Sequence, residues 1–172
     1  MPATARFFAA LVAAVVLHTL GTRLVPEFAR STDLFLVLTV LWALRGDSLG
    51  GLLAGLAAGL THDVLTSGLF ALHGCVDTVA GYAVARVSQR VLVERAGSVF
   101  LIAGVASLLQ QLLLAALVWV LLPEPELARP LWVGVQTAVN AVLAGTVFLA
   151  SGRLRRGLAA RRQSRAKKLH LD

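Results

Sequence analysis

The sequence predicts an all-α integral membrane protein with about six transmembrane helices in one bundle, followed by a basic tail. Of its 172 residues, 58% are apolar and only 15% are charged. Soluble domains have about 45–50% apolar and about 25% charged residues. A chain of this size that folded in water could not bury so much apolar surface. The bilayer is therefore the expected solvent, and six apolar stretches supply the candidate spans.

The six apolar stretches cover residues 7–24, 34–44, 48–61, 69–85, 99–122 and 131–150. A spanning helix needs about 20 mainly apolar residues. The second stretch is about 17 Å of helix at roughly 1.5 Å per residue, so it spans only if flanking polar residues join it. The third is also short and rich in glycine, and we expect protein rather than lipid to cover both. Pro123, Pro125 and Pro130 mark the boundary before the last stretch.

Basic residues predict the orientation of the chain. The net charge is +7, and eight of the 16 Lys and Arg residues lie between Arg153 and Lys168. With six spans and both termini in the cytoplasm, thirteen basic residues lie inside and three outside; with five spans the numbers are fourteen and two. Charge thus places the C-terminus in the cytoplasm without deciding the helix count. We expect a helical membrane domain over residues 1–152 and a cytoplasmic tail over 153–172.

The basic tail predicts contact with anionic lipid. Each Lys or Arg close to an anionic membrane surface contributes about 1 kcal/mol of attraction. Nucleic acid is not an expected partner, because no aromatic platform or nucleic-acid-binding fold accompanies the charge. The candidate lipid-binding residues are Arg153, Arg155, Arg156, Arg161 and Arg162.

The third stretch carries a line of small residues. Gly51, Gly55 and Gly59 recur every four residues and make one side of the helix nearly flat. Flat faces allow close backbone approach, which is a major source of helix association in membranes. We favour packing within one bundle over a partner-binding face, and both remain open.

Three ionisable residues are candidates for an intramembrane or interfacial site. Asp63 either caps a turn at the interface, which we favour, or marks a buried functional position. His73 and Asp77 lie four residues apart and share one helical face, so we expect a hydrogen-bonded pair, with a polar ligand cavity or a proton relay as alternatives. Two residues are too few for a metal site. Cys75, the single cysteine, is expected to be a small buried apolar residue.

Amide side chains occur inside the last two apolar stretches. Gln110 and Gln111 are in one, and Gln136 and Asn140 share a helical face in the other. Such amides commonly bridge helices in membranes. We favour bridging over the lining of a ligand cavity. His18 is expected to be a satisfied interhelical donor.

No assembly of catalytic residues is recognisable in the sequence. It contains no P-loop and no paired-aspartate protease pattern. We therefore expect a protein that is not an enzyme and that needs no cofactor.

Residues 33–82 resemble the MreD family of rod-shape membrane proteins. The matching features, in order, are Trp42-Ala43-Leu44-Arg45-Gly46, then Gly51, Gly55 and Gly59-Leu60 with Asp63, then Gly68-Leu69, Ala71-Leu72, Gly74 and Gly81-Tyr82. The family usually has a proline before the second apolar run, where this sequence has Ser31-Thr32-Asp33.

The resemblance implies a non-enzymatic scaffold in the bacterial cytoplasmic membrane. It would bind MreC and help to couple the MreB cytoskeleton to peptidoglycan synthesis by RodA and its penicillin-binding transpeptidase. The family is similar in fold to the substrate-binding subunits of energy-coupling-factor vitamin transporters, so a subunit of that kind is the alternative function. A proton-coupled carrier built around Asp63, His73 and Asp77 is a weaker hypothesis, because no inverted repeat is evident.

Overall fold

The computed structural model describes residues 3–66, 71–91, 95–123 and 128–169, with side chains described as far as Leu154. Every regular element in these residues is a helix, which confirms the all-α prediction. The helices are α1 (Ala3–Leu24), α2 (Phe28–Ser31), α3 (Leu34–Ala43), α4 (Ser48–Leu65), α5 (Leu72–Ser88), α6 (Ala96–Leu121) and α7 (Pro130–Leu169).

Four stretches among the described residues are long and apolar enough to span a membrane: Ala3–Leu24, Ser48–Leu65, Ala96–Leu121 and Pro130–Leu154. These four candidate spans are compatible with the multi-pass membrane protein predicted from composition, and they are fewer than the six predicted spans. The helix α5 has 17 residues and α3 has only 10, which is about 15 Å at roughly 1.5 Å per residue. The second apolar stretch is therefore as short as expected.

Protein covers α3 on most sides. It lies in the middle of the bundle and contacts α1, α4, α5, α6 and α7. Six of its 10 residues are buried: Phe35, Leu36, Val37, Thr39, Val40 and Ala43. The Asp33 side chain fixes the start of the helix by accepting from the backbone N–H groups of Phe35 and Leu36, at 3.0 and 2.9 Å. The helix ends where Gly46, at φ +77°, donates its N–H to the Ala43 carbonyl.

The line of glycines on α4 packs against α5. A methyl group added at Gly51 would lie 2.6 Å from the Gly81 carbonyl oxygen. The same addition at Gly55 or Gly59 would collide with the backbone of Asp77 or His73, respectively. The two helices are antiparallel and in backbone contact, so the glycine face lies inside the bundle. This α4 helix runs to Leu65, beyond the predicted end at residue 61, and therefore includes His62 and Asp63.

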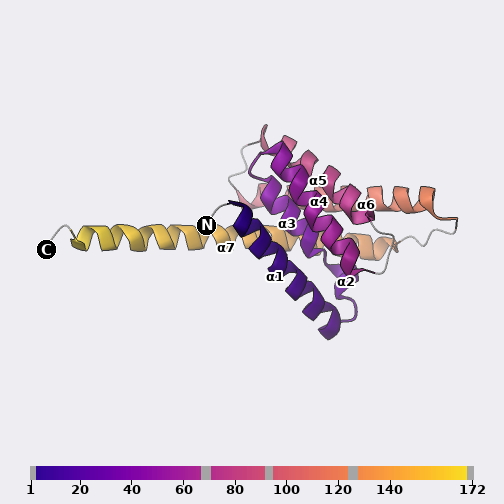
Figure 1. Ribbon diagram of the computed structural model, residues 1–172, viewed down its shortest axis with the longest axis horizontal. Helices are drawn as coiled ribbons and strands as arrows, with labels where there is room; N and C mark the ends of the chain where they lie inside the picture. Colours follow the sequence, from indigo (N-terminus) through magenta and orange to yellow (C-terminus); the bar gives the residue numbers. More distant parts are fainter. Residues whose placement is uncertain (1–2, 67–70, 92–94, 124–127, 170–172) are drawn as a thin grey trace.

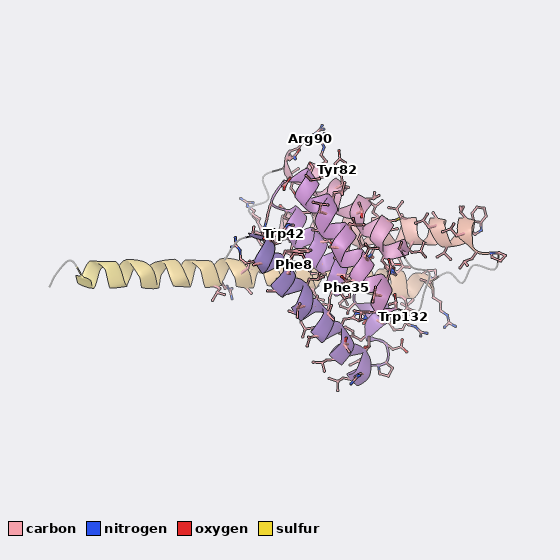
Figure 2. All side chains as sticks on the ribbon, in the orientation of Figure 1. Phe8, Phe35, Trp42, Tyr82, Arg90 and Trp132 are labelled. Atoms are coloured by element: carbon pink, nitrogen blue, oxygen red, sulfur yellow. The ribbon has the colours of Figure 1, made fainter. Side chains whose placement is uncertain are left out.

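One end of the bundle gathers five of the nine arginines whose side chains the structure describes. The rings of Phe7 and Trp42 lie 4.9 Å apart, and the Arg45 guanidinium carbon lies 3.4 Å from the Trp42 ring centre, so α1 begins where α3 ends (Figure 2). The Gln89 amide donates to the Gly46 carbonyl at 2.7 Å, which brings the end of α5 to the same place. We call this the basic end; its arginines are Arg6, Arg45, Arg86, Arg90 and Arg95.

The last helix leaves the bundle on the side where α1 begins (Figure 1). Gly145 lies close to Ala96 and Phe100 at the start of α6, so α7 passes the basic end before it continues outward. The predicted boundary between residues 152 and 153 falls inside α7, which runs to Leu169. The basic tail therefore begins as a continuation of the last helix.

Candidate functional site

Buried polar side chains form one connected cluster where α3, α4, α5, α6 and α7 meet. The most enclosed are Asp77, Ser107, Gln110, Asn140 and Asp33, each no more than 1% exposed. His62 and Asp63 are also buried, and His73 is partly buried. We call these eight residues the polar network. Ionisable groups at membrane depth are costly and generally face a bundle interior, as these do.

Gln110 joins two acidic side chains from different helices. Its amide nitrogen donates to Asp33 Oδ2 and to Asp77 Oδ1, each at 2.7 Å. A primary amide has two N–H groups, so both are used. The side chain of α6 thereby links the start of α3 to the middle of α5.

Asn140 makes a second link between helices. Its oxygen accepts from the Asp33 backbone N–H at 2.9 Å, and its nitrogen donates to the Ser107 hydroxyl at 3.0 Å. A separate amide pair, in which Gln111 donates to Gln136, joins α6 to α7 outside the network. All four amides thus bridge helices, the arrangement favoured by the sequence.

Asp63 caps the start of α5 from the end of α4. Its two oxygens accept from the backbone N–H groups of His73 and Gly74, at 3.0 and 2.9 Å, and Oδ1 lies 2.8 Å from His73 Nδ1. These N–H groups belong to the first turn of a helix and have no partner within it. Asp63 therefore has the capping role favoured from the sequence, although it caps the next helix rather than a local turn.

The predicted pair of His73 with Asp77 is wrong. His73 binds Asp63, and Asp77 accepts from Gln110. Helical spacing places residues four apart on one side of a helix, but the neighbouring helices decide which partner each side chain meets. Here α4 supplies a carboxylate to His73, and α6 supplies an amide to Asp77.

Three histidine rings lie in a row: His73 and His62 belong to the polar network, and His18 lies beside it. The ring centres of His62 and His73 are 4.1 Å apart, and those of His18 and His62 are 5.5 Å apart. His62 also stacks on Phe35 at 4.9 Å, and its Nδ1 lies 3.6 Å from Asp33 Oδ2. The expectation that His18 is a satisfied donor is wrong for one ring nitrogen. Its buried Nδ1 has no hydrogen-bond partner among the described residues, because α1 meets aromatic rings at this level.

Two central residues escaped the sequence analysis. Asp33 contacts three other helices, but in the sequence it was only the boundary of a short apolar run. An aspartate directly before such a run is a known helix-start signal, which could have identified its cap. No sequence signal pairs His62 with Asp33.

The prediction that Cys75 is buried is wrong. Cys75 is exposed, because it lies on the outer side of α5.

Several polar atoms in the cluster have no hydrogen-bond partner within the described structure. They include Asp77 Oδ2, Gln110 Oε1 and His62 Nδ1. A pocket of about 360 Å³ lies nearby, lined by His18, Thr19, Thr22, Ala29, Leu65 and Thr66. No group of three or more His, Cys, Asp or Glu side chains in the described residues is arranged to hold a metal ion. The arrangement is suited to joining helices and to accepting a polar molecule near His18.

Among the candidate lipid-binding arginines, the side chain of Arg153 is described, and it lies apart from the polar network. Arg153 is exposed on α7, beyond the basic end. The side chains of Arg155, Arg156, Arg161 and Arg162 lie outside the described residues.

Comparison of the chain with protein-family models, with curated proteins and with solved structures finds no match.

Proposed function

We propose that the chain is a non-enzymatic scaffold of the MreD type in the bacterial cytoplasmic membrane. It binds MreC and helps to couple the MreB cytoskeleton to peptidoglycan synthesis by RodA and its penicillin-binding transpeptidase. In this proposal α3 and α5 cross the membrane together with the four long apolar helices, which gives six spans with both termini in the cytoplasm.

The observation that carries the proposal is the way in which the buried polar groups are used. Gln110, Asn140 and Asp63 bind groups on neighbouring helices and so join five helices into one unit. A network of this kind fixes a single arrangement of helices. A fixed shape that presents an apolar outer surface to the membrane is what a docking platform requires.

The family resemblance supports the same proposal at particular residues. Gly51, Gly55, Gly59 and Asp63 carry the resemblance, and they also set the packing of α4 against α5 and the start of α5. The gathering of arginines at the end where α1 begins and α7 leaves supports a cytoplasmic position for both termini.

A complementation experiment tests the scaffold function. Depletion of the chain from its rod-shaped host should give rounded cells, and the wild-type chain should restore rods. Gln136→Leu should also restore them, because Gln136 and its partner Gln111 are only partly buried. Gln110 is a poor choice for this purpose, since its loss leaves two buried carboxylates without their donor. Cells that keep their rod shape without the chain would contradict the proposal.

The pocket beside His18 favours a second candidate, the substrate-binding subunit of a vitamin transporter. The hydroxyl groups of Thr19, Thr22 and Thr66 each donate to a backbone carbonyl, and their oxygens can still accept a hydrogen bond from a small ligand. A ligand at 100 times its Kd stabilises a protein by about 2.7 kcal/mol. Thermal unfolding of the purified chain with water-soluble vitamins should therefore raise Tm under this candidate, and Thr22→Leu should abolish the rise. The scaffold proposal predicts no rise.

A further inference from the structure

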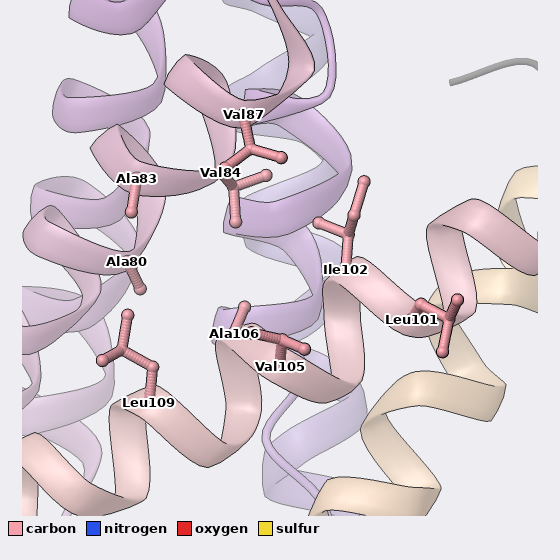
Figure 3. A pocket seen from close by; sticks show the side chains of 9 residues that line it. All are labelled: Ala80, Ala83, Val84, Val87, Leu101, Ile102, Val105, Ala106 and Leu109. Atoms are coloured by element: carbon pink, nitrogen blue, oxygen red, sulfur yellow. The ribbon is translucent and has the colours of Figure 1, made fainter. Parts of the chain in front are cut away.

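An apolar groove runs along the outer surface between α5 and α6. Its volume is about 220 Å³, and every side chain that lines it is a hydrocarbon (Figure 3). The lining residues are Ala80, Ala83, Val84, Val87, Leu101, Ile102, Val105, Ala106 and Leu109. Small side chains on α5 leave the space, and larger ones on α6 form the opposite wall. In a membrane such a groove faces the hydrocarbon region.

The length of the groove matches one leaflet of the bilayer. It extends over residues 80–87 of α5 and 101–109 of α6, or about 10–12 Å at roughly 1.5 Å per residue. The hydrocarbon core of a bilayer is about 30 Å thick, so one leaflet contributes about 15 Å. A single lipid chain needs only one leaflet.

The groove lies along the half of α5 and the half of α6 that are nearer to the basic end of the bundle. Arg90 lies about one helical turn beyond Val87, at the outer end of α5 (Figure 2). Arg95 directly precedes α6, on the same side of that helix as Ile102. Both arginines are exposed, and neither has an acidic partner among the described residues. Residues 86–95 contain three arginines and one glutamate, so this rim is positively charged.

We propose that this groove is a binding site for one anionic glycerophospholipid. One acyl chain lies in the groove between α5 and α6, and Arg90 and Arg95 bind the phosphate at the membrane surface. This site differs from the lipid-binding surface proposed for the C-terminal tail, because it combines two arginines with an apolar groove. It depends on the chain spanning a membrane and does not depend on the scaffold function.

A photo-crosslinking experiment tests the site. The full chain is reconstituted in phosphatidylcholine vesicles that contain a small fraction of phosphatidylglycerol with a photoactivatable group in its acyl chain. After illumination, the crosslinked peptides are identified by mass spectrometry. We expect crosslinks on residues 80–87 and 101–109. The same photoactivatable chain on phosphatidylcholine should give on the order of 25-fold less at these positions, because each arginine near an anionic group contributes about fivefold in affinity.

Two pairs of variants separate the parts of the site. Ala83→Leu fills the groove and should abolish the crosslinks, whereas Ala116→Leu, at an exposed alanine elsewhere on α6, should not. Arg90→Gln combined with Arg95→Gln should remove the preference for the anionic lipid, whereas Arg129→Gln should leave it unchanged. Circular dichroism of each variant verifies that the helices are intact.

Three results would overturn the proposal. Equal labelling by the two lipids would show a non-selective annular contact, and labelling confined to α7 would place the lipid on the tail. If Ala83→Leu leaves the lipid crosslinks unchanged but releases a co-purifying membrane protein, the groove holds a partner's helix instead.

Discussion

Replacement of Gly55 by alanine tests the backbone contact between α4 and α5. A methyl group at Gly55 would fall on the Asp77 carbonyl and lie 2.9 Å from the Thr78 Cα atom. Both are backbone atoms, so no flexible side chain can move aside. At Gly134 on α7, an added methyl group meets nothing within 4 Å. The chemical change, glycine to alanine, is therefore the same at both positions, and only the room for the added methyl group differs.

The difference between the two variants gives the energy of the close contact. Alanine favours the helix over glycine by about 1 kcal/mol, and both variants gain this amount. Only Gly55→Ala also incurs the cost of overpacking, typically about 1–3 kcal/mol. The free energy of unfolding of Gly55→Ala should thus lie about 1–3 kcal/mol below that of Gly134→Ala. Because the collision is with backbone, we expect the upper part of this range.

Reversible unfolding by dodecyl sulfate in mixed micelles, followed by circular dichroism, measures the difference. Gly97→Ala on α6, where the added methyl group also meets no atom within 4 Å, is a second control. Equal unfolding free energies for Gly55→Ala and the two controls would refute the packing of α4 against α5 described above.

Three further predictions concern the polar network and its surroundings. Gln110→Leu should lower the free energy of unfolding by about 3 kcal/mol, because two hydrogen bonds to buried carboxylates are lost. Gln111→Leu should cost about 1 kcal/mol or less, and equal losses in the same dodecyl sulfate assay would count against the network. Asp63→Ala should speed hydrogen exchange at the backbone amide of His73 by about fivefold, since loss of a helix cap costs about 1 kcal/mol; unchanged exchange would contradict the capping role. Cys75 should react with N-ethylmaleimide in the folded protein, and reaction only after unfolding would show that it is buried.

Composition and the lengths of the apolar stretches predicted much of the fold. The apolar stretches predicted the helices, and the short run over residues 34–44 predicted α3 as an element covered by protein. The spacing of Gly51, Gly55 and Gly59 predicted a flat face, which needs no tertiary information because it follows from helical geometry. These features are local, so the sequence carries them directly.

The connections of the site could not be predicted in the same way. His73 and Asp77 share a helix face but bind side chains from α4 and α6, respectively. The Asp33 carboxylate accepts from Gln110, which is 77 residues away in the sequence. The Asp33 backbone N–H donates to the Asn140 oxygen, which is 107 residues away. Such contacts depend on which helices are neighbours, and hydropathy does not determine that arrangement.

Purification of the tagged chain from its native membrane in mild detergent, with mass spectrometry of the proteins that accompany it, tests the scaffold proposal most directly. The proposal predicts MreC together with RodA or its transpeptidase partner. A transmembrane coupling protein with paired ATPases would contradict it and would establish the vitamin-transport function instead.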